Sequence, residues 1–153
     1  AQLDRFYFKI PLGYVDYETD FDILSHIDTI LDVQGQVKPV ITAEEIVSLQ
    51  QTAFQVHCDE SIIRAVTNLI HRTRESRKEI TVGASTRAGI YLLKLMKAHA
   101  LLKGRAFVTE DDFKTICYWG LHHRLVYANR KAGEEVLQVL IDAEVEKLRN
   151  RAV

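Results

Sequence analysis

The sequence contains few cysteines, and their positions exclude two classes of protein. Only Cys58 and Cys117 occur among 153 residues, far apart and in no CxxC or Cys/His spacing. Small secreted domains need several paired cysteines for a disulfide framework, and zinc sites need clusters of Cys and His. We therefore expect two reduced cysteines, no disulfide and no metal site, in a protein of the cytoplasm.

Long apolar runs and an excess of one charge are also missing. No stretch approaches the roughly 18 apolar residues that a membrane-spanning helix needs, and 20 Lys+Arg stand against 21 Asp+Glu, a net charge of −1. Nucleic-acid-binding proteins usually carry a basic excess. The balance of 47% apolar and 27% charged residues is that of a soluble globular domain. We expect no nucleic-acid partner and no membrane insertion. The chain starts at Ala1 rather than at a methionine, and we expect it to be part of a longer protein.

What the sequence does contain is a series of helix signals. Residues that cap helix N-termini stand ahead of apolar residues that recur every three or four positions. Two short β-like pieces, QVHC and AFVT, lie between these segments, and VQGQVKPVI and ESRKEITVG are predicted loops. The pattern predicts six helices. They start after Thr19, Thr42, Asp59, Ser85 and Thr109, and the last covers residues 134–149.

The N-terminal residues have a different pattern. Phe6, Phe8 and Ile10 alternate as they would in a β-strand, yet no second long strand follows to pair with them. The expected fold class is therefore all-α, a helical bundle with a short N-terminal strand remnant and minor β pieces. We expect residues 1–12 to be disordered, or to borrow a sheet edge from another copy.

An arginine stands at the start of the most apolar predicted helix. Ser85 is a good N-cap residue, so Arg87 falls in the first turn, where backbone N–H groups lack helical partners and the helix dipole is already positive. Lys94, seven residues on, lies on nearly the same side of the helix. An anionic ligand such as a phosphate would explain this arrangement. The alternative is that Arg87 pairs with a neighbouring carboxylate or lies in solvent, and periodicity alone does not decide between the two.

Several motifs together resemble the C-terminal part of AAA+ ATPases of the MoxR family. The chain opens with AQLDRF and FKIPLGY, which are similar to the end of the family's nucleotide-binding core and to the linker that follows it. GASTRA, IYLLKLMKAHALL, GRAFVTEDD and LHHRLV then follow in the order and at spacings of the family's lid domain. The resemblance covers residues 1 to about 127. It implies that residues 1–15 are the end of the core and the linker, and that residues 16–153 are a helical lid domain.

The resemblance also implies roles for individual residues. Arg5, in LDRF, matches the arginine finger, which reaches the γ-phosphate of ATP bound to a neighbouring subunit. Arg87 matches the sensor-2 arginine, which contacts phosphate from the lid of its own subunit. Tyr14, in the linker, matches a position near the adenine.

Cofactors and partners follow from the same resemblance. ATP and Mg²⁺ would be bound by the full-length parent, whose partners are its own N-terminal AAA+ core, neighbouring subunits of a homo-oligomeric ring, and an unknown protein substrate of a chaperone-like remodeller. The chain itself has no GxxxxGK[ST] phosphate loop and no apolar strand ending in an acidic pair that would hold Mg²⁺. We therefore expect ATP hydrolysis in the parent and none in this chain alone.

Four features depart from the family's pattern or lie outside it. Thr86 stands where the family usually has proline, so the start of the helix is less pre-organised. Gly120 interrupts a helix interior at a cost of roughly 1 kcal/mol, which indicates close packing or a kink. His122 and His123 are candidate ligands or acid–base groups, but adjacent helical residues point about 100° apart, and packing is the preferred interpretation. The basic run over residues 71–78 is interpreted as a solvated helix end.

A hypothesis of another class stays open. In it the chain is a free-standing helical adaptor that binds a partner protein and ignores nucleotides. Such an adaptor needs an exposed apolar helix face, and residues 134–149 are the candidate. The lid hypothesis instead needs arginines that are free to meet phosphate.

Overall fold

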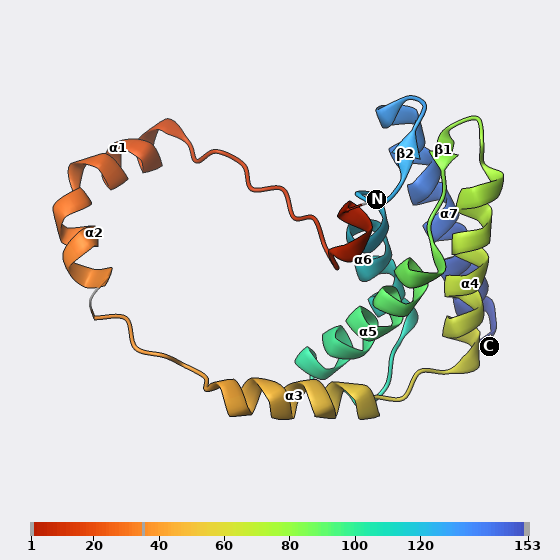
Figure 1. Cartoon of the computed structure of the whole chain (residues 1–153), viewed down its shortest axis with the longest axis horizontal. Coiled ribbons are helices and arrows are strands. Elements are labelled where there is room, and N and C mark those ends of the chain that lie inside the picture. The colour runs from red at the N-terminus through yellow and green to blue at the C-terminus, as the bar shows by residue number, and fades with distance from the viewer. Residues whose placement is uncertain (1, 35, 152–153) are drawn as a thin grey trace. The chain divides into compact units, whose positions relative to one another are not determined.

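The computed structural model describes residues 2–34 and 36–151. Helices dominate, and the strands form a two-stranded sheet, so the expected all-α class is confirmed (Figure 1). In chain order the elements are the 3-10 turn η1 (Leu3–Arg5), α1 (Tyr17–Ser25), α2 (Ile27–Gln34), α3 (Ala43–Gln55), α4 (Glu60–Glu75), β1 (Ile80–Val82), α5 (Thr86–Leu102), α6 (Glu110–Leu121), β2 (Val126–Tyr127) and α7 (Arg130–Arg151).

The chain divides into two compact units. Residues up to Lys9 and from Leu49 onward form the first, called the packed unit below. Ile10–Ser48 form the second, called segment 10–48. The domain boundary expected after residue 15 stays a prediction.

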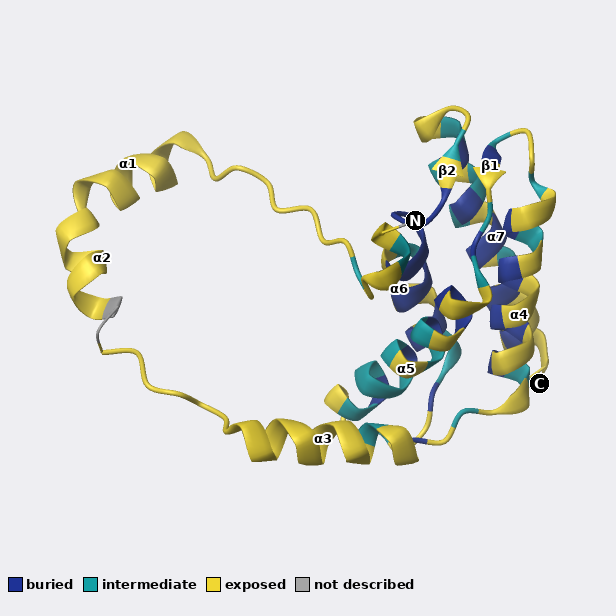
Figure 2. Cartoon of the chain, viewed as in Figure 1, coloured by how far each residue is buried: buried dark blue, intermediate teal, exposed yellow. Residues whose placement is uncertain are grey.

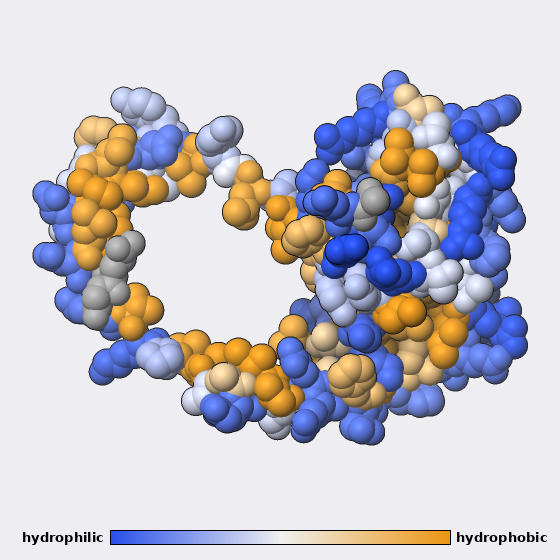
Figure 3. Space-filling model, in the orientation of Figure 1, coloured by the Kyte–Doolittle hydropathy of each residue, from blue (hydrophilic) through white to orange (hydrophobic). Residues whose placement is uncertain are grey.

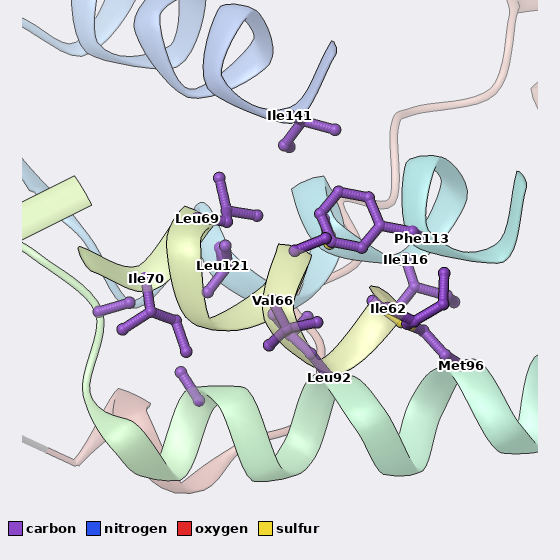
Figure 4. Packing of buried hydrophobic residues seen from close by; sticks show 14 of the residues in the cluster. Ile62, Val66, Leu69, Ile70, Leu92, Met96, Phe113, Ile116, Leu121 and Ile141 are labelled. Carbon is purple, nitrogen blue, oxygen red and sulfur yellow. The ribbon is translucent and has the colours of Figure 1, made fainter. Parts of the chain in front are cut away.

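Four helices, α4 to α7, build the core of the packed unit. α4 contacts α5 and α7, and α6 contacts the same two helices. On α4 the apolar residues recur every three or four positions and so share one buried face. Figure 2 shows buried residues on all four helices, and Figure 4 shows the side chains meeting in the interior. The labelled members of this cluster are Ile62, Val66, Leu69, Ile70, Leu92, Met96, Phe113, Ile116, Leu121 and Ile141.

The apolar face of α7 belongs to this core. The helix begins at Arg130, four residues earlier than predicted. The adaptor hypothesis needs this apolar face to be exposed. In the structure the face packs into the core, so it is not free to bind a partner. The buried apolar residues of α7 are Leu137, Leu140, Ile141, Val145 and Leu148.

Cap hydrogen bonds confirm the predicted starts of the helices in the packed unit. The carboxylate of Asp59 accepts a hydrogen bond from the Ser61 N–H at 2.8 Å, and the Ser85 hydroxyl accepts one from the Ala88 N–H at 3.3 Å. Thr109 forms a reciprocal capping box at the start of α6. These caps are local, which is why the sequence alone predicts them.

The first helix starts at a different cap from the one expected. The prediction that Thr19 caps it is wrong, because Asp16 accepts a hydrogen bond from the Thr19 N–H at 2.9 Å and α1 begins at Tyr17. The helix also ends at Ser25, with His26 as its C-cap, so one predicted helix becomes two, α1 and α2. Thr42 is confirmed as a capping-box residue ahead of α3, since it exchanges hydrogen bonds with Glu45 at 2.7 and 3.2 Å.

The short strands pair residues that are distant in sequence. β1 and β2 are antiparallel, with Ile80 opposite Tyr127 and Val82 opposite Val126. The predicted loop ESRKEITVG therefore contains a strand. The β-like pieces QVHC and AFVT meet as an isolated parallel bridge between His57 and Phe107.

The N-terminal strand expected from Phe6, Phe8 and Ile10 is not formed. Leu3–Arg5 form a 3-10 turn, and the residues after it have no strand partner within the described part of the chain. A strand needs a neighbour to satisfy its backbone groups, and the described residues supply none at this point. The alternation of apolar residues alone therefore led to the wrong prediction of a strand.

Disorder of the N-terminal residues, the other expectation, is wrong for residues 4–8. The Arg124 guanidinium donates hydrogen bonds to the backbone carbonyls of Asp4 and Phe6. Phe8 packs against the core of the packed unit. Side-chain donors thus replace the missing strand.

Segment 10–48 contains α1 and α2, whose described side chains are exposed (Figure 2). Its large apolar residues include Phe21, Leu24 and Leu31, which are 60%, 72% and 54% exposed. Figure 3 shows apolar side chains running along this part of the chain. Within the described residues, no helix combines the length and the apolar character that crossing a membrane requires.

Gly120 marks close packing, as expected. A Cβ atom at this position would lie 2.6 Å from Cδ2 of Leu92 on α5. The absence of a side chain therefore lets α5 and α6 approach each other closely.

Candidate functional site

A groove in the packed unit brings two of the predicted site residues together. It has a volume of about 560 Å³ and lies where the N-terminal turn, the loop before α5 and the residues after α6 meet. Arg5 and Arg87 both line it. Other lining residues that matter below are Asp4, Ser85, His123 and Arg124.

The N-terminus of α5 supplies one side of the groove. Ser85 caps the helix, which leaves the N–H groups of its first turn without helical acceptors. Arg87 lies in that turn with its side chain 53% exposed. A positive helix end and a half-exposed guanidinium together form a local environment that favours an anion.

The loop before α5 is fixed by the end of α4. The Thr73 hydroxyl accepts a hydrogen bond from the Ala84 N–H at 3.0 Å, and Arg74 Nε donates to the Ala84 carbonyl at 2.8 Å. The basic run over residues 71–78 is thus partly structural rather than simply solvated. Arg72 supports this conclusion, because it lies 3.4 Å from the buried carboxylate of Glu144.

Gly83 is required by this close approach, and its replacement gives a first prediction. A Cβ atom at residue 83 would lie 2.8 Å from both the Cα and the N of Arg74, which are backbone atoms that cannot rotate away. We expect Gly83→Ala to lower the free energy of unfolding by about 1–3 kcal/mol, measured by urea denaturation. Gly13→Ala is the control, because nothing lies within 4 Å of a Cβ there. An unchanged stability of Gly83→Ala would show that the loop adjusts freely.

Asp4 is the anionic group that occupies the groove in this structure. Both of its carboxylate oxygens accept from the Ser85 hydroxyl at 3.1 Å, and Oδ1 lies 2.9 Å from Arg124 Nη1. Arg87 Nη1 lies farther away, 3.8 Å from Oδ2. The alternative interpretation, that Arg87 pairs with a carboxylate, therefore holds for this arrangement. The pair is partly exposed and hence weak.

Arg5 lies in the 3-10 turn directly after Asp4. Its side chain is exposed, and no carboxylate forms an ion pair with it among the described residues. Two arginines of the groove, Arg5 and Arg87, are thus accessible. Arg124, with its side chain 1% exposed, is fully buried.

Tyr14 lies outside the packed unit. It belongs to segment 10–48, where its side chain is fully exposed. Its predicted place near an adenine stays a prediction.

Comparisons with known proteins show which family and which fold the chain resembles. Residues 72–147 match the family of AAA lid domains. The chain is 33% identical over 126 residues to the uncharacterized protein YeaC of Bacillus subtilis, and 26% identical over 144 residues to the chaperone MoxR1 of Mycobacterium tuberculosis. A crystal structure of a proposed ATPase from Cytophaga hutchinsonii matches 92% of the chain with a TM-score of 0.78 and 25% identity. The chain carries a MoxR-like AAA lid domain.

The lid domain is matched across most of the packed unit, while the relatives are much longer than this chain. The matches cover 82% of the chain for YeaC and 89% for MoxR1, but 39% and 37% of those proteins. For the Cytophaga hutchinsonii protein the covered share is 46%. The chain thus spans less than half the length of each of these proteins.

The GRAFVTEDD turn of the lid has a structural purpose. Arg105 donates two hydrogen bonds of 2.7 Å to the carboxylate of Asp112, which is fully buried. The same carboxylate accepts from the Thr109 N–H at 2.8 Å and lies 2.6 Å from His99 Nδ1. Gly104 ends α5 with a positive φ of 72°. These contacts connect α5 to α6, and none of them faces the groove.

The hydrogen bonds to Asp112 control its ionisation. Burial alone would raise the pKa of this carboxyl group, but the hydrogen bonds from Arg105, the Thr109 N–H and His99 outweigh that effect. The pKa of Asp112 is therefore held well below its usual value. The aspartate is ionised throughout the physiological range.

The two histidines of the lid are packing residues, which is the interpretation that the sequence favoured. His122 and His123 are 9% and 8% exposed, and burial is the main cause that lowers the pKa of each imidazole. His122 stacks on Tyr118 at 5.3 Å, and His123 Nε2 lies 3.1 Å from the Phe6 carbonyl. No group of three metal-ligating side chains occurs in the described part of the chain.

Both cysteines are free thiols in the structure. Cys117 is buried in the core and Cys58 is half-buried. Burial raises the pKa of both thiols. Neither is therefore a reactive thiolate at neutral pH.

An aromatic pair near the groove was missed by sequence reasoning. Tyr7 stacks on Tyr91 with ring centroids 4.1 Å apart, and the Arg124 guanidinium lies 5.0 Å from the centre of the Tyr91 ring. Tyr91 follows Arg87 by four residues, so helical spacing signals that the two share a face. Tyr7 and Arg124 carry no such local signal, because their partners are distant in sequence.

Proposed function

We propose that this chain is the lid-bearing C-terminal part of a MoxR-like AAA+ ATPase. A nucleotide-binding core elsewhere in the full-length protein would bind ATP and Mg²⁺, because this sequence has no phosphate loop. The relatives' greater length supports the proposal, since the chain covers 39% of YeaC and 37% of MoxR1. This chain alone would not hydrolyse ATP.

The observation that carries the proposal is the groove shared by Arg5 and Arg87. Both arginines line it, and both belong to the packed unit. Two accessible guanidinium groups beside a helix N-terminus favour a polyanionic ligand such as a triphosphate. Arg5 would serve as the arginine finger and Arg87 as the sensor-2 arginine.

Because Arg5 and Arg87 line a single groove, we expect both side chains to contact the same nucleotide. The resemblance gives the finger to a neighbouring subunit's ATP and sensor 2 to the subunit's own ATP. Residues that line the same groove of a single unit are poorly placed to serve two separate nucleotides. We therefore infer that Arg5 and Arg87 both act on the ATP of the neighbouring subunit in a ring.

The pairing of Asp4 with Arg87 is compatible with this function. The two side chains are 26% and 53% exposed and lie 3.8 Å apart, so little free energy is lost when a phosphate displaces the carboxylate from Arg87. A permanently charged guanidinium suits the transferring phosphoryl group better than an ammonium group does.

The assembly and its client are part of the same proposal. A ring of identical subunits supplies the neighbour that the finger needs, through a head-to-tail interface. MoxR1 is named a chaperone, and by analogy the full-length protein would remodel a protein substrate with the energy of ATP hydrolysis.

A subunit-mixing experiment tests whether both arginines act on the neighbour's ATP. One variant carries Arg87→Ala with an intact phosphate loop, and the other has a disabled phosphate loop with Arg87 intact. Each alone should have at most about a hundredth of the wild-type turnover, whereas a one-to-one mixture should recover turnover at roughly one quarter of the interfaces in the ring. Arg5→Ala in place of Arg87→Ala should give the same recovery. If the Arg87→Ala mixture stays inactive while the Arg5→Ala mixture recovers, Arg87 serves its own subunit's nucleotide.

A further inference from the structure

Arg124, in the turn after α6, binds the chain on both sides of Arg5. Its Nη1 donates to the carbonyl oxygen of Asp4 at 2.5 Å and to the carboxylate of Asp4 at 2.9 Å. Its Nη2 donates to the carbonyl oxygen of Phe6. The residue between these two acceptors is Arg5, so the guanidinium holds the backbone from which the Arg5 side chain projects.

The Arg124 side chain is itself fixed in the lid. It is 1% exposed, and its Nε donates to the carbonyl of Gly120 one turn earlier in α6 at 2.8 Å. The guanidinium also lies 5.0 Å from the centre of the Tyr91 ring on α5. A buried guanidinium that uses donors in three directions has little freedom to move.

Neighbouring residues strengthen the same attachment. His123 Nε2 lies 3.1 Å from the Phe6 carbonyl, which therefore receives two donors. Tyr7 stacks on Tyr91 at 4.1 Å with the rings 19° from parallel. Residues 4–7 are thus attached to α5 and α6 rather than to any strand among the described residues.

We propose that Arg124 is the positioning residue of the arginine finger. This proposal rests on the function proposed above for Arg5. Arg124 lies behind the finger rather than on the nucleotide, and it acts by fixing the turn that carries Arg5 to the lid. Arg5 and Arg87 are then parts of one rigid body, and a movement of the lid moves both arginines relative to the phosphates.

Lysine is the informative replacement for Arg124. It keeps the positive charge beside Asp4, but its single nitrogen cannot reach the carbonyls of Asp4, Phe6 and Gly120 together. A neutral truncation would leave a cavity and remove a donor from the carbonyls of Asp4, Phe6 and Gly120, and the domain could fail to fold. Arg64→Lys is the matched control, because Arg64 is exposed on α4 and pairs only within its own helix with Glu60 among the described residues.

The first experiment is an NMR comparison of this chain with its Arg124→Lys variant. We expect the contacts between the rings of Tyr7 and Tyr91 to disappear, while the amide signals of α4 and α7 stay unchanged. Arg64→Lys should keep all of these signals. Persistence of the Tyr7–Tyr91 contacts in Arg124→Lys would overturn the proposed attachment.

The second experiment is a double-mutant cycle in the full-length protein. Arg124→Lys should lower kcat for ATP hydrolysis at least tenfold with a smaller change in KM, and should cause no further loss when combined with Arg5→Ala. A purely structural role would give the same factor in both backgrounds and would overturn the positioning role. If Arg5→Ala alone leaves turnover unchanged, the proposed function of Arg5 fails, whereas the NMR result still decides whether Arg124 holds the turn.

Discussion

Arg5→Ala is expected to slow ATP hydrolysis by the full-length protein on the order of a thousandfold, the usual contribution of a finger arginine to phosphoryl transfer. Arg87→Ala should slow it by on the order of a hundredfold, because a second guanidinium stabilises the same developing charge. Both arginines line one groove and are accessible. A buried residue nearby would therefore not replace the positive charge that either substitution removes. Steady-state phosphate release at saturating ATP is the measurement.

The control and the conservative variants make the result specific. Arg64→Ala removes an exposed arginine that lies outside the groove, and its turnover should stay within twofold of the wild type. Arg87→Lys should recover part of the lost rate, since lysine keeps the charge but not the planar fork. Turnover that survives both Arg5→Ala and Arg87→Ala would exclude the roles proposed for the two arginines.

Local chemistry is what the sequence predicted best. The caps Asp59, Ser85 and Thr109 bond to N–H groups two or three residues away, so their motifs contain both partners. The core of α4 to α7 follows from apolar residues at helical spacing. Arg87 was placed correctly at the start of α5 for the same reason.

The features that the sequence did not predict depend on contacts between residues that are far apart in the chain. Arg124 and Asp4 are 120 residues apart, and neither has a local pattern that names the other. The pairing of Ile80 with Tyr127 likewise joins two segments too short to give a strand signal. The N-terminal residues were misread because a side chain, rather than a second strand, satisfies their backbone.

The same distinction between local and long-range contacts separates two ion pairs of arginine, Arg105 with Asp112 and Arg124 with Asp4. Arg105 and Asp112 belong to one short motif, GRAFVTEDD, and their bond is part of the local turn between α5 and α6. Arg124 instead connects the lid to the N-terminal turn. Arg105 therefore holds α5 to α6, whereas Arg124 holds the N-terminal turn that carries Arg5.

Asp112→Asn is expected to destabilise the packed unit by about 3 kcal/mol at neutral pH, the usual cost of removing one charge from a buried ion pair. The substitution would leave the Arg105 guanidinium without its carboxylate and weaken the capping box of Thr109. Urea denaturation at pH 7 is the measurement. Asp111→Asn is the matched control, since its carboxylate is 74% exposed and its loss should cost less than 1 kcal/mol.

The stabilisation by Asp112 should also depend on pH in a defined direction. Its pKa in the folded protein is held well below the usual aspartate value of about 3.9. A depressed native pKa means that the unfolded state binds the proton first as pH falls, so the contribution is complete above about pH 5 and declines below pH 4. The stability difference between wild type and Asp112→Asn should therefore narrow from pH 7 toward about pH 3. A difference that stays constant over this range would mean that the hydrogen-bond geometry of residue 112, rather than its charge, holds α5 to α6.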